Sequence, residues 1–313
     1  MINRTLVRTK VLQTVFAYYK DGDKSPLTAR KELLKSFDST YSLYMMLLAL
    51  SDELVTYAEE QIAENQQRAA ITHQTYVANR NFVNNQVSRH LFNNRRLRNF
   101  LEENHLRWDV GMVEVTNIYK QLIQTPYYQE YMALSEPSLE DDKALWRKIY
   151  GTLLIGNESL YAALDEIELV YDYQGWSTDA DQILTYVVKT IKQFTQERGD
   201  NQVLLEMFTS EEELDFAKEL LNATLTHAEE YKPLIAKSLK NWEAERVAYM
   251  DQTILLVALA EIINFPQIAL EISMNEYIEL SKEYSGEKSY TFINGVLNKI
   301  VGDLRKENAL FKV

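Results

Sequence analysis

The chain lacks cysteine, contains few glycines and prolines, and has no long hydrophobic run. Without cysteine it can form neither a disulfide nor a thiolate metal site, which is compatible with a reducing cytoplasm. Nine glycines and five prolines in 313 residues leave long segments that can form helices. No window approaches the roughly eighteen consecutive apolar residues of a membrane span, and the N-terminal segment is too charged for a signal peptide. We therefore expect an all-α cytoplasmic protein.

The second shortage is of positive charge, because the chain carries a formal net charge of −13. This balance argues against a protein whose whole surface is coated with nucleic acid. Salt limits the reach of each charge to about 10 Å, so a local basic patch can still bind an anion. If the chain binds RNA, it should do so on a defined strip.

Apolar residues at helical spacing predict a first helix over about residues 3–19, followed by a turn at 20–23. A short helix is expected after Pro26, and a longer one over about residues 41–62. From about residue 211 onwards the pattern predicts amphipathic helices. Proline and glycine commonly end helices, so breaks are expected at three places: 231–233, 265–266 and 285–286.

The most informative segment is 276–297, which reads EYIELSKEYSGEKSYTFINGVL. On a helix drawn at about 100° per residue, aliphatic side chains between 293 and 304 gather on one side. Lys288, Phe292, Gly295 and Lys299 gather on another. An exposed ring between lysines can stack on a base while ammonium groups bind phosphates. The alternatives are that Phe292 is a core residue and that Gly295 admits a neighbouring helix instead of an RNA backbone.

Basic residues also open the first helix. Arg4 and Arg8 extend its apolar stripe past the end of the core, where cations oppose the helix dipole by up to about 1 kcal/mol each. A bound phosphate would offset that cost. The alternative is that both are ordinary surface bases.

Residues 275–297 resemble the C-terminal helix pair of the transcription antitermination factor NusB family, whose pattern reads N-E-x-I-E-L-A-K…S-x-x-F-V-N-G-V-L. The chain has NEYIELSK at 275–282, Ser289, and FINGVL at 292–297. Residues 1 to about 38 resemble the first helix and turn of the family, and 251–262 resemble a later helix. The resemblance implies a NusB-like helical bundle formed by residues 1–38 and 211–313, with a helical extension or insertion over 39–210.

This resemblance implies an RNA-binding antitermination factor. Such proteins bind boxA-type RNA of nascent ribosomal transcripts together with NusE, a small-subunit ribosomal protein, and promote read-through by RNA polymerase. We predict one set of RNA-binding residues: Arg4, Arg8, Lys10, Lys288, Phe292 and Lys299. Phe16 and Asp251 match positions at the NusE interface. The alternative is a protein–protein scaffold that kept the fold without specific RNA binding.

No pattern favours catalysis. The four histidines lack metal-ligand spacing, and the single Glu-x-x-His, Glu102–His105, is one pair where a di-iron site needs two. There is no phosphate-binding glycine loop and no G-x-S-x-G motif. We therefore expect no enzyme, no metal site and no cofactor. An RNA methyltransferase with a NusB-like domain is not expected either, because no methyl-donor domain follows the signature helices.

The middle of the chain contains a basic segment between Ala78 and Trp108, with only two acidic residues, Glu102 and Glu103. Its six arginines are Arg80, Arg89, Arg95, Arg96, Arg98 and Arg107. Phenylalanines at 82, 92 and 100 alternate with them. Arginines with interleaved aromatic rings suit single-stranded RNA, so this segment is a candidate second RNA surface. The alternative is a solvated helix face whose phenylalanines point inward.

Overall fold

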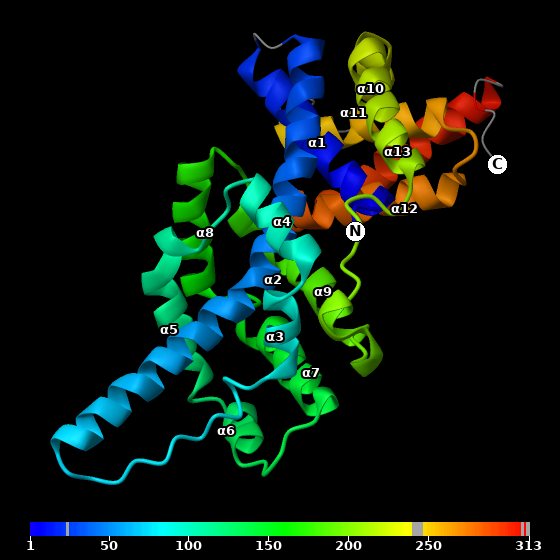
Figure 1. Ribbon diagram of the computed structural model, residues 1–313. Coiled ribbons are helices and arrows are strands. Elements are labelled where there is room, and N and C mark those ends of the chain that lie inside the picture. The colour runs from blue at the N-terminus through cyan, green and yellow to red at the C-terminus, as the bar shows by residue number, and fades with distance from the viewer. Residues whose placement is uncertain (23–24, 240–246, 308–309, 311–313) are drawn as a thin grey trace. The chain divides into compact units, whose positions relative to one another are not determined.

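The computed structural model describes residues 1–22, 25–239, 247–307 and 310 (Figure 1). In this part of the chain the regular secondary structure is helical, and the one β contact is an isolated parallel bridge between Ile2 and Phe208. The all-α prediction is confirmed. None of these helices is long and apolar enough to cross a membrane. Nor do the described residues include three or more His, Asp or Glu grouped as metal ligands.

The chain divides into two compact units. Unit 1 comprises Met1–Phe37 and Met207–Val313, and unit 2 comprises Asp38–Glu206. The boundaries predicted from sequence fall after residues 38 and 210. The RNA-binding role predicted for residues 1–38 and 211–313 stays a prediction.

Unit 1 is built around a buried helix, α11 (Tyr249–Asn264), which packs against four other helices. These are α1 (Arg4–Asp21), α10 (Glu211–Ser238), α12 (Leu270–Tyr284) and α13 (Ser289–Lys306). The side chain of Asn3 caps α1 by accepting a hydrogen bond from the Leu6 N–H at 3.0 Å. Gly22, in the left-handed region at φ 71°, ends the helix.

Two of the three predicted helix breaks are confirmed, since α11 ends at Asn264 and α12 ends at Tyr284. The predicted break near Pro233 is wrong, because α10 continues through it to Ser238. Proline cannot donate to the carbonyl four residues earlier, which belongs to the exposed Glu229. Water can take the donor's place there, so the helix continues.

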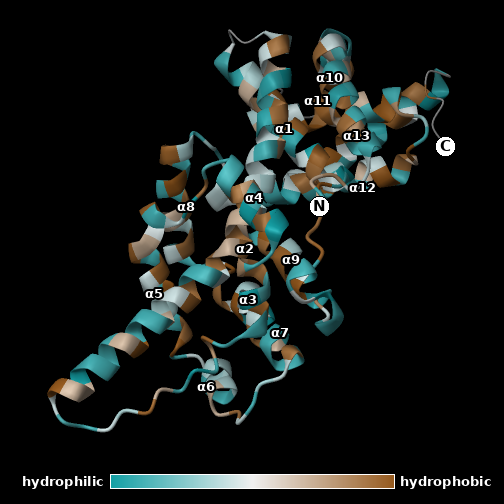
Figure 2. Cartoon of the chain, in the orientation of Figure 1, coloured by the Kyte–Doolittle hydropathy of each residue, from teal (hydrophilic) through white to brown (hydrophobic). Residues whose placement is uncertain are grey.

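The two helices predicted after Pro26 form one helix, α2 (Pro26–Ile71), whose residues belong to unit 1 up to Phe37 and to unit 2 beyond it. The prediction of two separate helices is wrong, and no proline or glycine interrupts the helix before residue 41. In unit 2, Ser39 and Thr40 are buried, and Ser39 Oγ accepts a hydrogen bond from the Trp176 indole at 2.9 Å. The last turns of α2 are mostly hydrophilic and exposed (Figure 2).

Unit 2 packs short helices around the middle of α2. They are α3 (Gln86–Phe92), α4 (Arg95–Glu103), η1 (Asp109–Gly111), α5 (Met112–Leu122), α6 (Pro126–Met132), α7 (Leu139–Lys148), η2 (Ile149–Leu153), α8 (Glu158–Tyr171), α9 (Trp176–Lys192) and η3 (Gln196–Asn201). Trp108, Trp146 and Trp176 are fully buried in its core. Each indole N–H is bonded, and that of Trp108 donates to the carbonyl of Met46 on α2 at 2.9 Å.

Asn85 connects three helices of unit 2. Its side-chain oxygen caps α3 by accepting from the Val87 and Ser88 N–H groups at 2.9 and 3.3 Å. The same oxygen accepts from the Trp146 indole of α7 at 2.9 Å. Its amide donates to the Tyr131 hydroxyl of α6 at 3.2 Å. A single buried side chain thereby satisfies four polar groups.

Glu53 on α2 should make the stability of unit 2 depend on pH. Burial, with the charges of Asp52 and Asp109, raises the pKa of Glu53 from 4.5 to about 7. The folded protein then binds more protons than the unfolded chain between these values, so stability falls as pH rises from 4.5 to about 7. We expect Glu53→Gln to raise the free energy of unfolding by about 1–2 kcal/mol at pH 8, after allowance for the partial exposure of the carboxyl. It should change little at pH 4.5.

Urea denaturation of wild type and Glu53→Gln at both pH values measures this effect. The exposed Glu130 on α6 provides a control, and Glu130→Gln should leave stability unchanged at either pH. An equal gain for Glu53→Gln at pH 4.5 and pH 8 would show that its carboxyl does not titrate as described.

Candidate nucleic-acid interface

The turn between α12 and α13 is fixed by a buried carboxylate on α11. Ser285 Oγ donates to Asp251 Oδ1 at 2.7 Å, and Ser289 Oγ donates to Asp251 Oδ2 at 3.2 Å. Asp251 is 6% exposed. Its carboxylate therefore holds the chain on either side of Lys288, the N-cap residue of α13.

The two faces of α13 lie where its helical spacing predicts. Its apolar side chains are buried: Ile293, Val296, Leu297, Ile300, Val301 and Leu304. Lys288, Gly295 and Lys299 are exposed, whereas Phe292 is half-buried, so its ring is partly accessible. Whether this face binds RNA stays a prediction.

Gly295 faces open space. Among the described residues, apart from the neighbouring residues and backbone of α13 itself, no atom lies within 4 Å of the position that a Cβ at Gly295 would take. A glycine inside a helix costs about 1 kcal/mol relative to alanine. Close approach of a neighbouring helix therefore does not account for Gly295 in the described part of the chain, and the backbone is open to a ligand.

Two further residues of this region were not singled out from sequence. Tyr290 is 44% exposed, and the Lys282 ammonium lies 5.7 Å from the centre of its ring. The spacing of Tyr290 two residues before Phe292 was the available signal. We define the α12–α13 surface as Lys282, Lys288, Tyr290, Phe292 and Gly295.

Arg8 is not available to a phosphate. It is 2% exposed, and its Nε and Nη2 donate to the two carboxylate oxygens of Glu261 at 2.7 and 2.8 Å. A third nitrogen, Nη1, lies 3.2 Å from Glu276 Oε2. The prediction that Arg8 binds RNA directly is therefore corrected, because its charge is neutralised inside unit 1. Sequence could not reveal this pair, since its partners lie more than 250 residues away.

The Arg8–Glu261 pair stays ionised although it is buried. Burial opposes the charge on Arg8, but hydrogen bonding and the negative charge of Glu261 outweigh it, so the pKa of Arg8 lies above its ordinary value. Burial likewise raises the pKa of Glu261, but Arg8 and the hydroxyls of Ser273 and Tyr277 outweigh it and hold that pKa below 4.5. These hydroxyls donate to Glu261 at 2.6 and 2.9 Å.

Arg4 and Lys10, the other predicted cations of α1, differ in exposure. Lys10 is 4% exposed on a helix that packs against α10 and α11, so its predicted role as a surface phosphate ligand is also corrected. The Arg4 side chain is 36% exposed and lies 3.5 Å from Glu213 Oε2. Its guanidinium also lies 5.1 Å from the ring centre of Phe216. Only Arg4 of the three predicted α1 cations offers an accessible charge.

The structure does not bring all the predicted RNA-binding residues together. Arg4 lies against Phe216 near the start of α10. Lys299 donates to the carbonyl of Ser238, the last residue of α10, at 3.0 Å. These two contacts are roughly 33 Å apart along the helix at 1.5 Å per residue. Arg4 and Lys299 therefore cannot bind the same phosphate.

The predicted partner residues lie at one end of α11. The half-buried Phe16 meets Tyr249 edge to face at 5.2 Å, and the Lys20 ammonium lies 5.6 Å from the Phe16 ring centre. Tyr249 is 41% exposed, so this aromatic pair can be reached by a partner. Asp251 follows Tyr249 by two residues, but its carboxylate accepts hydrogen bonds from Ser285 and Ser289. The prediction that Asp251 contacts a partner directly is therefore corrected.

Comparison with known proteins identifies a family. The family model described as NusB family matches residues 179–302. These residues run from the start of α9 through most of α13, so α1 lies outside the match.

Several relatives carry the name transcription antitermination protein NusB. The chain is 39% identical over 98 residues to the one from Salinibacter ruber, covering 31% of this chain and 61% of that protein. It is 37% identical over 97 residues to that of Finegoldia magna, covering 31% and 69%, and 37% identical over 114 residues to that of Clostridium botulinum, covering 36% and 77%. No solved structure matches the chain.

The helical fold and the α12–α13 surface define an all-α protein with an exposed face of lysines and aromatic rings. The chain belongs to the NusB family. The family motif on α12 and α13 falls inside the matched region, whereas most of unit 2 lies outside it.

Proposed function

We propose that this protein is a transcription antitermination factor that binds boxA-type RNA of nascent ribosomal transcripts through unit 1. The observation that carries the proposal is the α12–α13 surface. It combines an exposed lysine, two accessible rings and a bare glycine on the helix that bears the family motif. The names of the relatives support the same function.

Binding would need no covalent chemistry. Lys288 would meet a phosphate, Tyr290 and Phe292 would stack on bases, and Gly295 would let the RNA backbone approach the helix. Lys299 would extend the α12–α13 surface further along α13. Arg8 would act by positioning α1 against α11 and α12, not by touching RNA.

NusE would bind at the other aromatic surface of unit 1, formed by Phe16, Tyr249 and Lys20. A protein partner fits this surface because two packed rings offer apolar area and the lysine offers a charge at its rim. The complex would then help RNA polymerase to read through terminators. The competing function is a scaffold without specific RNA binding, which the net charge of −13 favours.

Lys288→Glu should weaken RNA binding about tenfold and reduce the magnitude of the log–log salt slope by roughly 0.7 or more, because one phosphate contact is lost. Lys288 is exposed and has no acidic partner among the described residues, so the variant should fold normally. Lys306→Glu, at the far end of α13, makes the same charge change and should bind like wild type. Unchanged affinity for Lys288→Glu would remove this residue from the site.

The function itself is tested by fluorescence anisotropy of a labelled boxA-like RNA, with and without NusE, at several salt concentrations. Selective binding that NusE strengthens, with a salt slope implying several phosphate contacts, would support antitermination. No selectivity over a scrambled RNA, even with NusE, would favour the scaffold.

A further inference from the structure

Unit 2 contains a local reversal of charge. Between Glu64 and Glu102 the chain has no Asp or Glu, although it is acidic overall. The same stretch holds six arginines: Arg68, Arg80, Arg89, Arg95, Arg96 and Arg98. Positive charge is therefore concentrated on one part of unit 2.

Three of these arginines are neutralised within unit 2. Arg68 lies 3.5 Å from Glu64, and Arg80 lies 2.6 Å from Glu59. Arg96 donates to both carboxylate oxygens of Glu206 at 2.5 and 2.6 Å. Each of these three guanidinium groups therefore already has a carboxylate partner.

The other three arginines have no carboxylate partner in the described part of the chain. Arg89, Arg95 and Arg98 are exposed, and none has an acidic partner within 4.0 Å in the described part of the chain. Arg89 lies on α3, and Arg95 and Arg98 lie one turn apart on α4. An anionic ligand would supply the missing partner.

An exposed aromatic ring lies among these cations. Phe92, at the end of α3, is 53% exposed, and the Arg98 guanidinium lies 6.0 Å from its ring centre. Arg89 precedes Phe92 by three residues and so lies on the same side of α3. We define the arginine strip as Arg89, Phe92, Arg95 and Arg98. A ring between guanidinium groups suits base stacking with phosphate contacts on either side.

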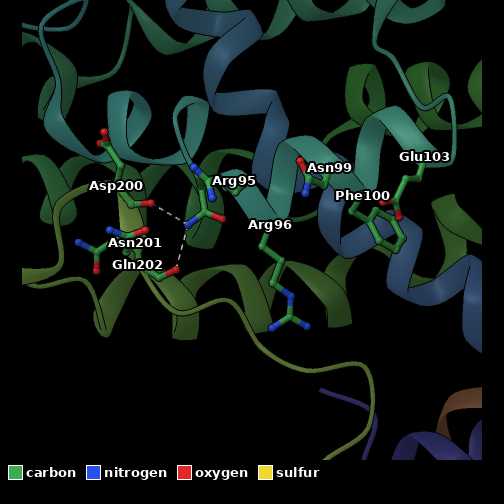
Figure 3. A pocket seen from close by; sticks show the side chains of 9 residues that line it. Arg95, Arg96, Asn99, Phe100, Glu103, Asp200, Asn201 and Gln202 are labelled. Carbon is green, nitrogen blue, oxygen red and sulfur yellow. Dashed lines mark hydrogen bonds between the residues drawn. The ribbon is translucent and has the colours of Figure 1, made fainter.

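Hollows flank α4 on both sides of the arginine strip. One of about 550 Å³ lies between α4 and residues 200–202, where Arg95 and Asn99 stand between Asp200 and Glu103 (Figure 3). The carboxylate of Asp200 is occupied by His90, whose Nδ1 lies 2.8 Å from it. The other hollow, of about 260 Å³, is lined by Phe92 and Arg98 together with Asp52 of α2. Each hollow has room for a base or a phosphate of RNA beside an arginine.

We propose that the arginine strip binds single-stranded RNA without sequence preference. An acidic peptide would use the arginines but not the exposed ring, and the bases of a duplex are not free to stack on Phe92. Stacking on a ring and contact with phosphates are possible for any sequence, so the strip would add affinity and not selectivity. The inference stands on residues of unit 2 and does not depend on boxA recognition by unit 1.

The test uses the full chain and a labelled twelve-nucleotide oligouridine, with anisotropy measured over a range of salt. To isolate the strip, all proteins carry Lys288→Glu in unit 1. We expect Arg95→Gln/Arg98→Gln to weaken binding at least tenfold and to reduce the magnitude of the salt slope by about 1.4. Phe92→Ala should weaken binding roughly tenfold with an unchanged slope, because it removes stacking and not charge. Phe92→Leu, which keeps an apolar side chain, should be weakened similarly.

The matched control is Arg107→Gln/Arg147→Gln, which removes two exposed arginines of unit 2 outside the strip and should bind like the Lys288→Glu parent. Equal loss in this control, or no loss in the strip variants, would overturn the proposal. The proposal would also be overturned if the strip variants bound an oligoglutamate peptide more weakly but still bound RNA as tightly as their parent. Selectivity for boxA-like RNA is measured separately, in protein with Lys288 intact. The proposed antitermination function and the proposed RNA binding by the arginine strip are therefore tested independently.

Discussion

Replacing Arg8 by methionine is expected to lower the free energy of unfolding by about 3–5 kcal/mol, measured by urea denaturation followed by circular dichroism. The cost arises because Glu261, at 0% exposure, would lose the positive charge that neutralises it and would keep only the hydroxyls of Ser273 and Tyr277 as donors. Methionine matches the aliphatic stem of arginine, so the loss should come mainly from the missing guanidinium. A double variant with Glu261→Gln should recover much of the stability, since no buried charge would remain.

Arg4→Met is the matched control for Arg8→Met, because it removes the same group from the same helix. The Arg4 side chain is partly exposed and its ion pairs are 3.5 and 4.0 Å long, so its loss should cost no more than about 1 kcal/mol. Equal losses for Arg4→Met and Arg8→Met would contradict the role given to the buried pair.

The Arg8 variant should also reverse the response of unit 1 to acid. In the wild type the pKa of Glu261 lies below 4.5, so its stabilisation is complete above that pH and is lost as pH falls through the lowered pKa. Without Arg8, burial would be opposed only by the hydroxyls of Ser273 and Tyr277, so the pKa of Glu261 should rise. The variant should then gain stability as pH falls toward 4.5.

Asn85→Ala should destabilise unit 2 by about 3 kcal/mol, since it removes a helix cap and leaves the buried Trp146 indole without an acceptor. The loss of the cap costs roughly 0.5–2 kcal/mol and the unsatisfied donor roughly 1–3 kcal/mol. Tryptophan fluorescence during urea denaturation reports this change, because Trp146 contacts Asn85 directly. The exposed Asn93 lies at the other end of α3, and Asn93→Ala should cost less than 1 kcal/mol.

A loss no larger than that of Asn93→Ala would show that the network around Asn85 contributes little. If the loss is as expected, heating should release α3 from α7 at a lower temperature in the variant. The arginine strip would be disturbed at the same time, because Arg89 and Phe92 lie on α3.

Helices were predictable where local sequence decides them. The end of α1 at Gly22 and the breaks before Pro266 and Gly286 follow from the backbone preferences of glycine and proline. Errors arose where packing decides. Residues 38–40 are polar, yet they continue α2 because the buried Ser39 has partners more than a hundred residues away.

The candidate site was predictable to the same extent. Helical spacing correctly separated the buried and exposed sides of α13, and it placed Arg8 on the buried stripe of α1. It could not show that Glu261 would meet Arg8 there, so a buried ion pair resembled a phosphate site. In unit 2, sequence showed six arginines alike, whereas only the fold distinguishes Arg96, which pairs with Glu206, from Arg95, which has no acidic partner among the described residues.

At Gly295, α13 has a notch in its outer surface, because no side chain fills that turn of the helix. A notch selects ligands by shape, and shape complementarity, unlike the attraction between lysines and phosphates, is not screened by salt. Raising the salt concentration should therefore weaken the binding of every RNA while leaving the ratios between their affinities largely unchanged. Strength of binding and discrimination among RNAs would then be set by different residues of one helix.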